Sequence, residues 1–180
     1  MYKGMPLILN ALRRLSTRYP NLSLTVIAFQ ETGCCSALSS CYQIIDAGWI
    51  KGAEIGPYYS AMDYFFMPSV ADAFGLMAIE AMAGGATPIV TVGTALPALV
   101  GAPVYGLCSE HSEDTYADTV ETAILRADLN AEGRAARQHF AHEHYSLNTF
   151  CKKLAGIYDE EIEYSHSTGV TSDYFVDARC

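Results

Sequence analysis

Apolar residues recur at helical spacing close to the start of the chain. Ile8, Ala11, Leu12 and Leu15 lie three or four positions apart, which is the period of one face of an α-helix. The pattern stops before Pro20, and a proline removes a hydrogen bond from a helix interior. The same reasoning predicts further helices at residues 55–62, 75–83, 116–126, 131–144 and 147–163.

Runs rich in β-branched and aromatic residues separate these helices. Residues 22–29 form the longest such run and contain no charged residue. Near-continuous apolar runs are typical of strands that are buried on both faces of a parallel sheet. Strands are predicted at residues 22–29, 43–48, 64–67, 87–92 and 104–107.

The alternation of strands and helices decides the fold class. It favours an α/β protein with a Rossmann-like, open parallel sheet that has helices on both faces. We find no internal repeat and no linker, so residues 1–163 are predicted to form one domain. The apolar periodicity is lost afterwards, and residues 164–180 are expected to form a loose tail.

Composition and charge exclude several classes of protein. With 51% hydrophobic and 17% charged residues, the chain is not expected to be disordered. A formal net charge of -9 argues against sequence-independent binding to nucleic acid, which needs clustered basic residues. The basic residues Lys3, Arg13, Arg14 and Arg18 precede the first acidic one. They could face anionic phosphates or a membrane surface, but we favour a solvated helix face.

The longest uncharged run and the cysteines both favour a cytoplasmic protein. Residues 81–109 are long enough to cross a bilayer, but their prolines and glycines rule out one continuous helix. We therefore predict strand, loop and strand there. Residues 1–6 lack the long apolar core of a signal peptide. None of the six cysteines shows C-x-x-C spacing, so reduced thiols are expected, and a zinc role for Cys34, Cys35 and Cys41 is not favoured.

Candidate chemistry lies where the strand at residues 64–67 ends. A loop from Pro68 to Gly75 leads into a helix, and Asp72 and Glu80 are separated by seven residues. Helix N-termini leave backbone N–H groups unpaired and carry partial positive charge, so such a loop can hold a phosphate. Glu80 could then reach hydroxyl groups on the phosphate's carrier. The pattern predicts a site for a sugar nucleotide.

An ordered set of short motifs resembles the retaining GT-B glycosyltransferases of family 4, also called glycosyl transferases group 1. The resemblance covers roughly residues 3 to 160, and its segment from Tyr59 to Pro97 is specific. Leu147, Phe150, Leu154 and Tyr158 resemble the helix that ends such chains. The motifs are Lys3-Gly4, Gly48-Trp49-Ile50, Tyr59 to Asp63, Pro68-Ser69, Phe74-Gly75-Leu76, Glu80-Ala-Met-Ala and Ala95-Leu-Pro97.

The resemblance implies one half of a GT-B fold, the half that binds a nucleoside diphosphate sugar. It implies that a lysine placed like Lys3 neutralises the diphosphate and that Glu80 hydrogen-bonds the ribose. No metal ion and no cofactor besides the sugar nucleotide are implied. The donor-binding residues are expected to be Lys3, Ala73, Phe74, Gly75, Leu76 and Glu80.

Asp72 is the expected catalytic residue, and it departs from the family pattern. The family has a glutamate there, which holds sugar hydroxyls near the reacting carbon. An aspartate is one methylene shorter, so its reach falls by roughly 1.5 Å on bond-length grounds. A misplacement of about 1 Å can cost on the order of a hundredfold in rate.

The resemblance also implies a second domain that binds the acceptor. That domain, and a strand with a Gly-Arg pair, would precede the donor domain, so we expect a fragment that lacks its first strand and is inactive alone. The acceptor domain would act in cis or in trans and could contact a membrane peripherally. The expected reaction is retaining transfer, of the hexosyltransferase type, to an acceptor hydroxyl. Alternatives are a non-catalytic nucleotide-sugar-binding or scaffold subunit and a GT-B-like epimerase.

Overall fold

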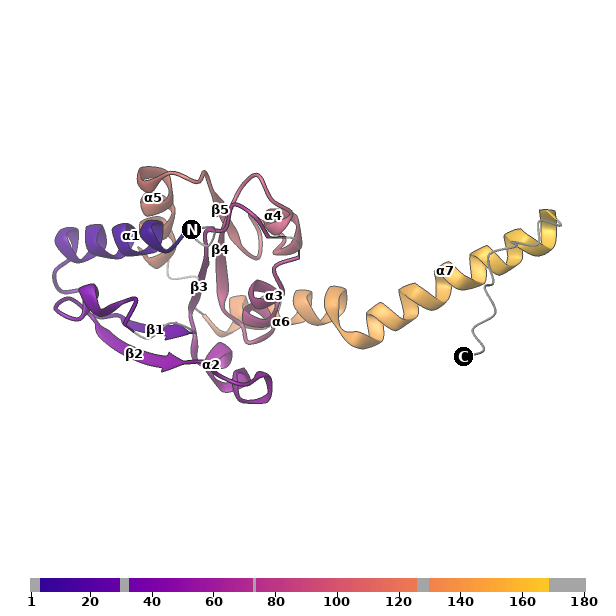
Figure 1. Cartoon of the computed structure of the whole chain (residues 1–180), viewed down its shortest axis with the longest axis horizontal. Coiled ribbons are helices and arrows are strands. Elements are labelled where there is room, and N and C mark those ends of the chain that lie inside the picture. The colour runs from indigo at the N-terminus through magenta and orange to yellow at the C-terminus, as the bar shows by residue number, and fades with distance from the viewer. Residues whose placement is uncertain (1–3, 30–32, 73, 126–129, 169–180) are drawn as a thin grey trace, which may run out of the picture. The chain divides into compact units, whose positions relative to one another are not determined.

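The computed structural model describes residues 4–29, 33–72, 74–125 and 130–168. The chain divides into two compact units, Met1–His142 and Glu143–Cys180. The first contains all the described strands and the first five α-helices, and the second contains the last and longest helix, α7 (Leu147–Thr168) (Figure 1). The candidate site lies entirely within the first unit.

The first unit is an α/β structure with parallel strands, as predicted. β1 (Thr25–Phe29) pairs in parallel with β2 (Gln43–Gly48). β4 (Thr87–Thr91) lies between β3 (Tyr64–Met67) and β5 (Leu107–Ser109), again in parallel. The described strands thus form two sheets, ordered β1-β2 and β3-β4-β5.

Helices cover both faces of these sheets, which confirms the predicted class (Figure 1). Most predicted elements begin and end within about three residues of the observed ones. The helices of the first unit, and the one that crosses its boundary, are α1 (Met5–Arg18), α2 (Gly56–Ala61), α3 (Leu76–Ala83), α4 (Leu96–Leu99), α5 (Glu113–Leu125) and α6 (Ala131–Tyr145), with short 3₁₀ turns at Ser36–Leu38 and Gly52–Glu54.

Two predictions about boundaries were wrong. The last strand was placed at residues 104–107, but the N–H groups of Val104 and Tyr105 both bond to the Gly101 carbonyl in a turn, at 3.0 and 3.1 Å. The tail was expected to begin at residue 164, but α7 continues to Thr168. Residues 164–168 contain no glycine or proline, and a helix can continue beyond its apolar pattern where no such residue stops it.

The central strand β4 shows how the two faces are built. All five of its residues are buried. Ile89 belongs to the core cluster that α1 and α5 cover, while the next residue, Val90, belongs to the cluster that α2 and α3 cover. Successive side chains of a strand point to opposite faces, and full burial of each such residue is worth about 1.5–3 kcal/mol. The uncharged run at 81–109 thus contains two strands, β4 and β5, as predicted, together with the end of α3 and the short helix α4 between the strands.

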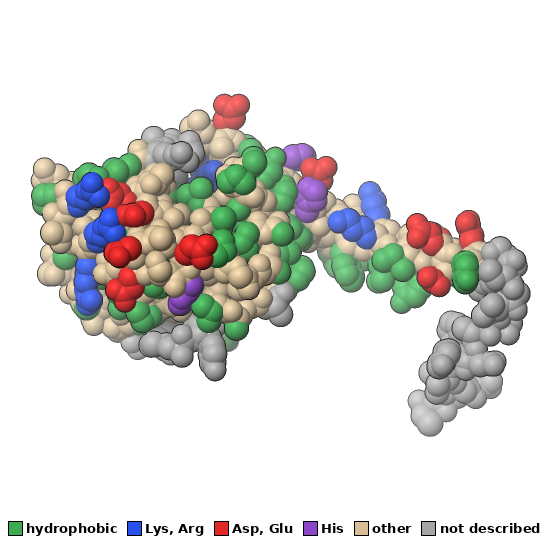
Figure 2. Space-filling model, turned by 90° about the horizontal axis from the view of Figure 1, so that it is seen from above, with side chains coloured by type: hydrophobic (Ala, Val, Ile, Leu, Met, Phe, Trp, Pro, Cys, Tyr) green, Lys and Arg blue, Asp and Glu red, His purple; other side chains and the backbone are tan. Residues whose placement is uncertain are grey.

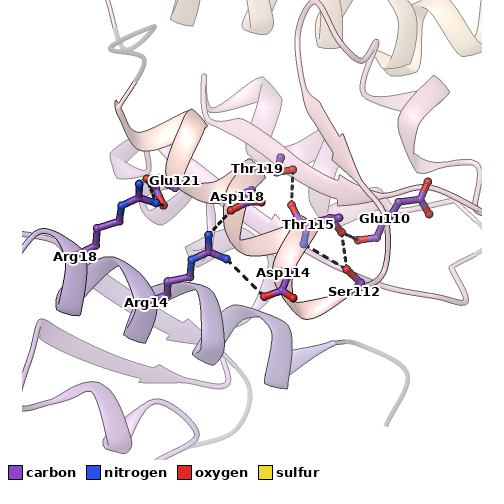
Figure 3. Close-up of polar contacts among 9 residues, drawn as sticks. All are labelled: Arg14, Arg18, Glu110, Ser112, Asp114, Thr115, Asp118, Thr119 and Glu121. Atoms are coloured by element: carbon purple, nitrogen blue, oxygen red, sulfur yellow. Dashed lines mark hydrogen bonds and ion pairs between the residues drawn. The ribbon is translucent and has the colours of Figure 1, made fainter.

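The basic face of α1 is paired with acidic residues of α5 (Figure 3). Arg14 bonds to Asp118 and lies 3.7 Å from Asp114, and Arg18 Nη1 lies 2.9 Å from a Glu121 carboxylate oxygen. Residues 114, 118 and 121 share one side of α5 because they are spaced by four and three positions. The side chains of Arg14 and Arg18 remain 35% and 57% exposed, so this face is solvated, as we favoured, and its ion pairs are with α5 of the same chain.

The described helices also bear on the membrane question. None of those within residues 4–29, 33–72, 74–125 and 130–168 combines the length and the apolar character that crossing a bilayer requires.

Candidate functional site

The site begins where β3 ends. The loop from Pro68 to Gly75 is anchored to the sheet by a buried hydrogen bond, in which Thr91 Oγ1 of β4 donates to the Ser69 carbonyl at 2.7 Å. Ser69 itself is 2% exposed. The predicted start of the next helix is confirmed, because α3 begins at Leu76 with Gly75 as its N-cap. The loop is therefore fixed at both ends, by the sheet and by the helix.

Gly75 is required by its backbone and by its surroundings. Its φ of +63° lies in the left-handed region, which costs an L-residue with a side chain roughly 1–2 kcal/mol. A Cβ at this position would lie 2.2 Å from Leu96 Cδ2, and Leu96 is fully buried. The chain can turn into α3 here because the residue is glycine.

Asp72 makes a contact that the sequence reasoning missed. Its Oδ1 accepts hydrogen bonds from the backbone N–H groups of Phe74, at 3.1 Å, and Gly75, at 2.5 Å. Those are two of the amides that were predicted to bind the donor. A signal was present in the sequence, since aspartate often bonds to backbone N–H groups two or three residues ahead in turns and helix caps.

Glu80 is held by a buried tyrosine. The Tyr59 hydroxyl, from α2, donates to Glu80 Oε2 at 3.0 Å, and Tyr59 is only 3% exposed. Burial first, and the neighbouring carboxylate second, raise the pKa of Tyr59 well above its usual value, so the phenol stays protonated and donates. An ionised carboxylate accepts several hydrogen bonds, which leaves Glu80 able to bind further hydroxyl groups.

A cavity of about 250 Å³ adjoins this pair. Phe29 and Gly48 reach it from the carboxyl ends of β1 and β2, and Trp49 and Ile50 follow on the same loop. Tyr59, Met77 and Glu80 complete its other side. Its volume is below the roughly 300–1,000 Å³ of pockets that enclose a whole small-molecule ligand, so it suits one part of a ligand.

A second hollow, of about 420 Å³, is lined by residues between Arg18 and Leu22 and by Leu125. It lies before β1 begins, at the amino end of the strand. Ligands of open α/β sheets bind outside the carboxyl ends of the strands. We therefore take the cavity beside Glu80 as the candidate site.

The predicted site residues divide into three groups. Lys3 and Ala73 lie outside the described residues. Asp72, Phe74 and Gly75 come together through the two hydrogen bonds of the loop, and Leu76 begins α3. Glu80 lies on α3 beside the cavity. Sequence reasoning missed the role of Tyr59, although the residue lies in one of the motifs of the resemblance.

A family match assigns the chain to known proteins. The sequence model of the family glycosyl transferases group 1 matches residues 1–126. This range includes β1 to β5, the loop of the candidate site and α3. The chain belongs to this family. The resemblance of the motifs is thereby confirmed.

Its curated relatives are glycosyltransferases of greater length. D-inositol 3-phosphate glycosyltransferase of Saccharomonospora viridis is 32% identical over 122 residues, which are 66% of this chain and 28% of that protein. The enzyme of the same name from Mycobacterium marinum is 36% identical over 94 residues, 49% of this chain and 20% of the relative. Uncharacterized glycosyltransferase 335 of Sulfolobus islandicus rod-shaped virus 1 is 29% identical over 92 residues, 49% of this chain and 27% of the relative. The chain thus spans only a fifth to about a quarter of these relatives.

Solved structures share the fold at lower identity. Sucrose-phosphate synthase from Thermosynechococcus elongatus superposes with a TM-score of 0.70 at 18% identity, over 91% of this chain and 43% of that one. Anabaena Alr3699/HepE in complex with UDP gives 0.69 at 18%, over 88% and 46%. The C-terminal domain of the group 1 glycosyl transferase LpcC from Francisella tularensis gives 0.64 at 22%, over 81% of both chains. These likenesses confirm a Rossmann-like fold that corresponds to one half of a GT-B enzyme.

Proposed function

We propose that this chain is the donor-binding domain of a retaining glycosyltransferase, which binds a nucleoside diphosphate sugar for transfer to an acceptor hydroxyl. One observation carries the proposal. Glu80 is oriented by the buried Tyr59 hydroxyl beside a cavity at the carboxyl ends of β1 and β2. Membership of a glycosyltransferase family, and the UDP bound in the Anabaena structure, support it.

The cavity and Glu80 suit the nucleoside part of the donor. Phe29, Trp49 and Ile50 offer apolar and aromatic walls for a base, and aromatic side chains favour stacked or edge contacts with other rings. Glu80 would accept hydrogen bonds from the ribose hydroxyls. Because Tyr59 already holds Oε2, the carboxylate is preorganised, and less conformational entropy is lost on binding.

The start of α3 suits the phosphate and the sugar. The backbone N–H groups of Phe74, Gly75 and Leu76 lie at the positive end of a helix dipole, where charge on a leaving diphosphate would be stabilised. We include Lys3 and Ala73 in this part of the site on the family pattern. Neutralisation by protein groups is why we propose transfer without a metal ion.

Asp72 is proposed to orient the transferred sugar. Its carboxylate is bound to Phe74 and Gly75 of its own loop, so a donor that uses those amides must compete with it. That contact favours one second candidate, a nucleotide-sugar-binding subunit without catalytic activity. The two candidates differ in whether Asp72→Glu, in an assembly complete with an acceptor domain, changes the rate of transfer.

We infer that the rest of the enzyme comes from an acceptor-binding domain, in cis or in trans. The chain spans 28% or less of the three relatives named above. Substrate positioning and water exclusion in a cleft between two domains supply much of the rate in such an arrangement. The chain alone should therefore bind the donor without measurable transfer of a hexosyl group. Any contact with a membrane would be made by the acceptor domain.

Titration calorimetry with UDP, GDP and their glucose conjugates tests donor binding. Loss of a charged hydrogen-bond acceptor costs about 1.5–3 kcal/mol, which is roughly ten- to a hundredfold in affinity. Glu80→Gln should weaken binding of the bare nucleotide and of the conjugate, whereas Asp72→Asn should weaken the conjugate alone.

Glu110→Gln is the matched control. Glu110 is exposed and lies before α5 (Figure 3), so its variant should bind like the wild type. Equal affinities for the Glu80 variant, the Glu110 variant and the wild type would refute the assignment. So would the absence of any nucleotide binding by the wild-type chain.

A further inference from the structure

Two helices bring together the pair of side chains at the candidate site. Tyr59 lies on α2 and Glu80 lies on α3, and the hydrogen bond between them, at 3.0 Å, crosses from one helix to the other. A hydrogen bond exists only over a narrow range of distance and angle. The orientation of Glu80 therefore depends on the spacing between α2 and α3.

The two helices approach each other most closely at Gly84. This residue caps α3, and its N–H donates to the Glu80 carbonyl at 3.0 Å. A Cβ at Gly84 would lie 2.6 Å from the carbonyl carbon and the carbonyl oxygen of Tyr59. Its φ of -74° is an ordinary helical value. The glycine is thus required by the closeness of α2 and not by its own backbone conformation.

Arg134 of α6 joins the ends of the same two helices. Its Nη2 donates to the carbonyls of Ser60 and Gly84, at 2.7 and 3.1 Å. Its Nη1 donates to the carbonyl of Met62, the residue that caps α2, at 2.8 Å. A guanidinium is planar and presents its donors in a fixed fork. The three carbonyls are therefore held at a fixed spacing.

Burial distinguishes Arg134 from the surface ion pairs of the first unit. Figure 2 shows charged side chains of both signs gathered over α1 and α5, where exposed pairs contribute little each. The side chain of Arg134 is only 24% exposed, and its ion pair with Asp63, at 3.4 Å, is longer than its three contacts with carbonyls. Hydrogen bonds from a charged donor are also stronger than those between neutral groups. Arg134 thus holds backbone rather than another side chain.

These contacts form a closed ring, whose members in order are Glu80, Tyr59, Ser60, Arg134 and Gly84. We propose that Arg134 is a positioning residue for Glu80. It holds the ends of α2 and α3 at the spacing at which the Tyr59 hydroxyl orients the carboxylate. Arg134 is not one of the described residues that line the cavity, so it acts on a ligand through Glu80. For nucleotide binding, this role rests on the proposed function.

A double-mutant cycle on unfolding in urea measures the contact between Tyr59 and Glu80 without any ligand. Tyr59→Phe and Glu80→Ala, singly and together, should show a coupling of roughly tenfold or more in the unfolding constant, because the hydrogen bond has a charged acceptor. With Arg134→Met in the background, the coupling should fall to below about threefold. An undiminished coupling in that background would overturn the proposal.

Arg137→Met is the matched control. Arg137 lies one turn further along α6, is 5% exposed, and donates from Nε to the Gly85 carbonyl at 2.9 Å. Its loss should also destabilise the fold but leave the coupling unchanged. An equal loss of coupling in the two variants would indicate general loosening and would refute a specific role for Arg134.

Arg134→Lys provides a milder perturbation. It keeps the positive charge but not the planar fork of donors, so it should reduce the coupling by a smaller factor than Arg134→Met. It also replaces the methionine variant in the cycle if that variant does not fold. A coupling equal to that of the wild type in the lysine variant would then count against the proposal.

Titration calorimetry with UDP or GDP shows whether this spacing matters for binding. Arg134→Met should weaken the nucleotide that the wild type binds roughly three- to tenfold, and Arg137→Met should weaken it by less than about twofold. The effect of Arg134→Met should disappear in a Glu80→Ala background. It should also disappear with the 2′,3′-dideoxy nucleotide, which lacks the hydroxyl groups that Glu80 would bind.

The outcomes separate this role from the proposed function. If Glu80→Ala weakens binding and Arg134→Met does not, the proposed function stands and the positioning role is refuted. An effect of Arg134→Met that persists in the Glu80→Ala background would refute it as well. If no nucleotide binds the wild type, the proposed function fails, and the unfolding cycle alone decides whether Arg134 positions Glu80.

Discussion

Replacement of Gly75 by alanine measures how strongly the loop of the candidate site is constrained. The residue has a φ of +63°, and this left-handed backbone costs an L-residue with a side chain roughly 1–2 kcal/mol. The added Cβ would lie 2.2 Å from Leu96 Cδ2 in a buried environment, and overpacking a core costs typically about 1–3 kcal/mol. We expect a total loss of about 2–5 kcal/mol, a large share of the roughly 5–15 kcal/mol that stabilises an ordinary domain.

Urea unfolding followed by circular dichroism gives the free energy directly. Gly56→Ala is the matched control, because a Cβ there meets nothing within 4 Å and the residue begins α2. It should leave stability within about 1 kcal/mol of the wild type. Leu96→Val removes the δ-carbons that would clash. In combination with Gly75→Ala it should therefore restore about 1–3 kcal/mol of the free energy of unfolding that Gly75→Ala removes.

The size of that recovery separates the two costs. If the pair of substitutions is additive, no steric conflict with Leu96 exists. If Gly75→Ala costs no more than Gly56→Ala, the left-handed turn into α3 is not part of the folded protein, and the placement of Phe74 and Leu76 at its start fails with it.

Two further predictions follow from contacts outside the site. Arg134 donates hydrogen bonds to three backbone carbonyls, of Ser60, Met62 and Gly84, at 2.7 to 3.1 Å. Arg134→Met should therefore lower the free energy of unfolding by about 2–4 kcal/mol. The same substitution at the exposed Arg13 is the control and should lower it by less than about 0.5 kcal/mol. Burial raises the pKa of the Cys35 thiol to about 11, whereas hydrogen bonds from Ser16 and Ser40 lower that of Cys41. At pH 8, iodoacetamide should therefore modify Cys41 first and Cys35 last, as peptide mass spectrometry would show, and the reverse order would contradict these environments.

Local patterns determined much of the fold from sequence alone. The alternation of apolar strands with amphipathic helices predicts a parallel α/β structure, and the structure has one. The loop that ends in Gly75 was placed correctly at the start of α3. These features depend on residues that are near one another in the chain, where helix period, strand composition and glycine conformation act directly.

The same local reasoning failed where a pattern had two readings. The apolar run at residues 104–107 is compatible with a strand, but its first residues turn back to Gly101, and the strand begins only at Leu107. The loss of apolar periodicity at residue 164 suggested a tail, although nothing in the following four residues ends a helix. Periodicity reports burial of a face, whereas a helix end is decided by residues that cannot continue it.

Only the tertiary structure decided the partners of the charged and polar groups. Tyr59 and Glu80 are 21 positions apart, and Arg14 and Asp118 are 104 apart. Which side chains meet depends on how helices pack against the sheets, and many pairings of a given sequence satisfy the same local patterns. The sequence thus determined the family, the fold class and the residue types of the site. The packed structure decided that Glu80 is held by a buried phenol and that Asp72 binds its own loop, because hydrogen bonds act only over about 3 Å.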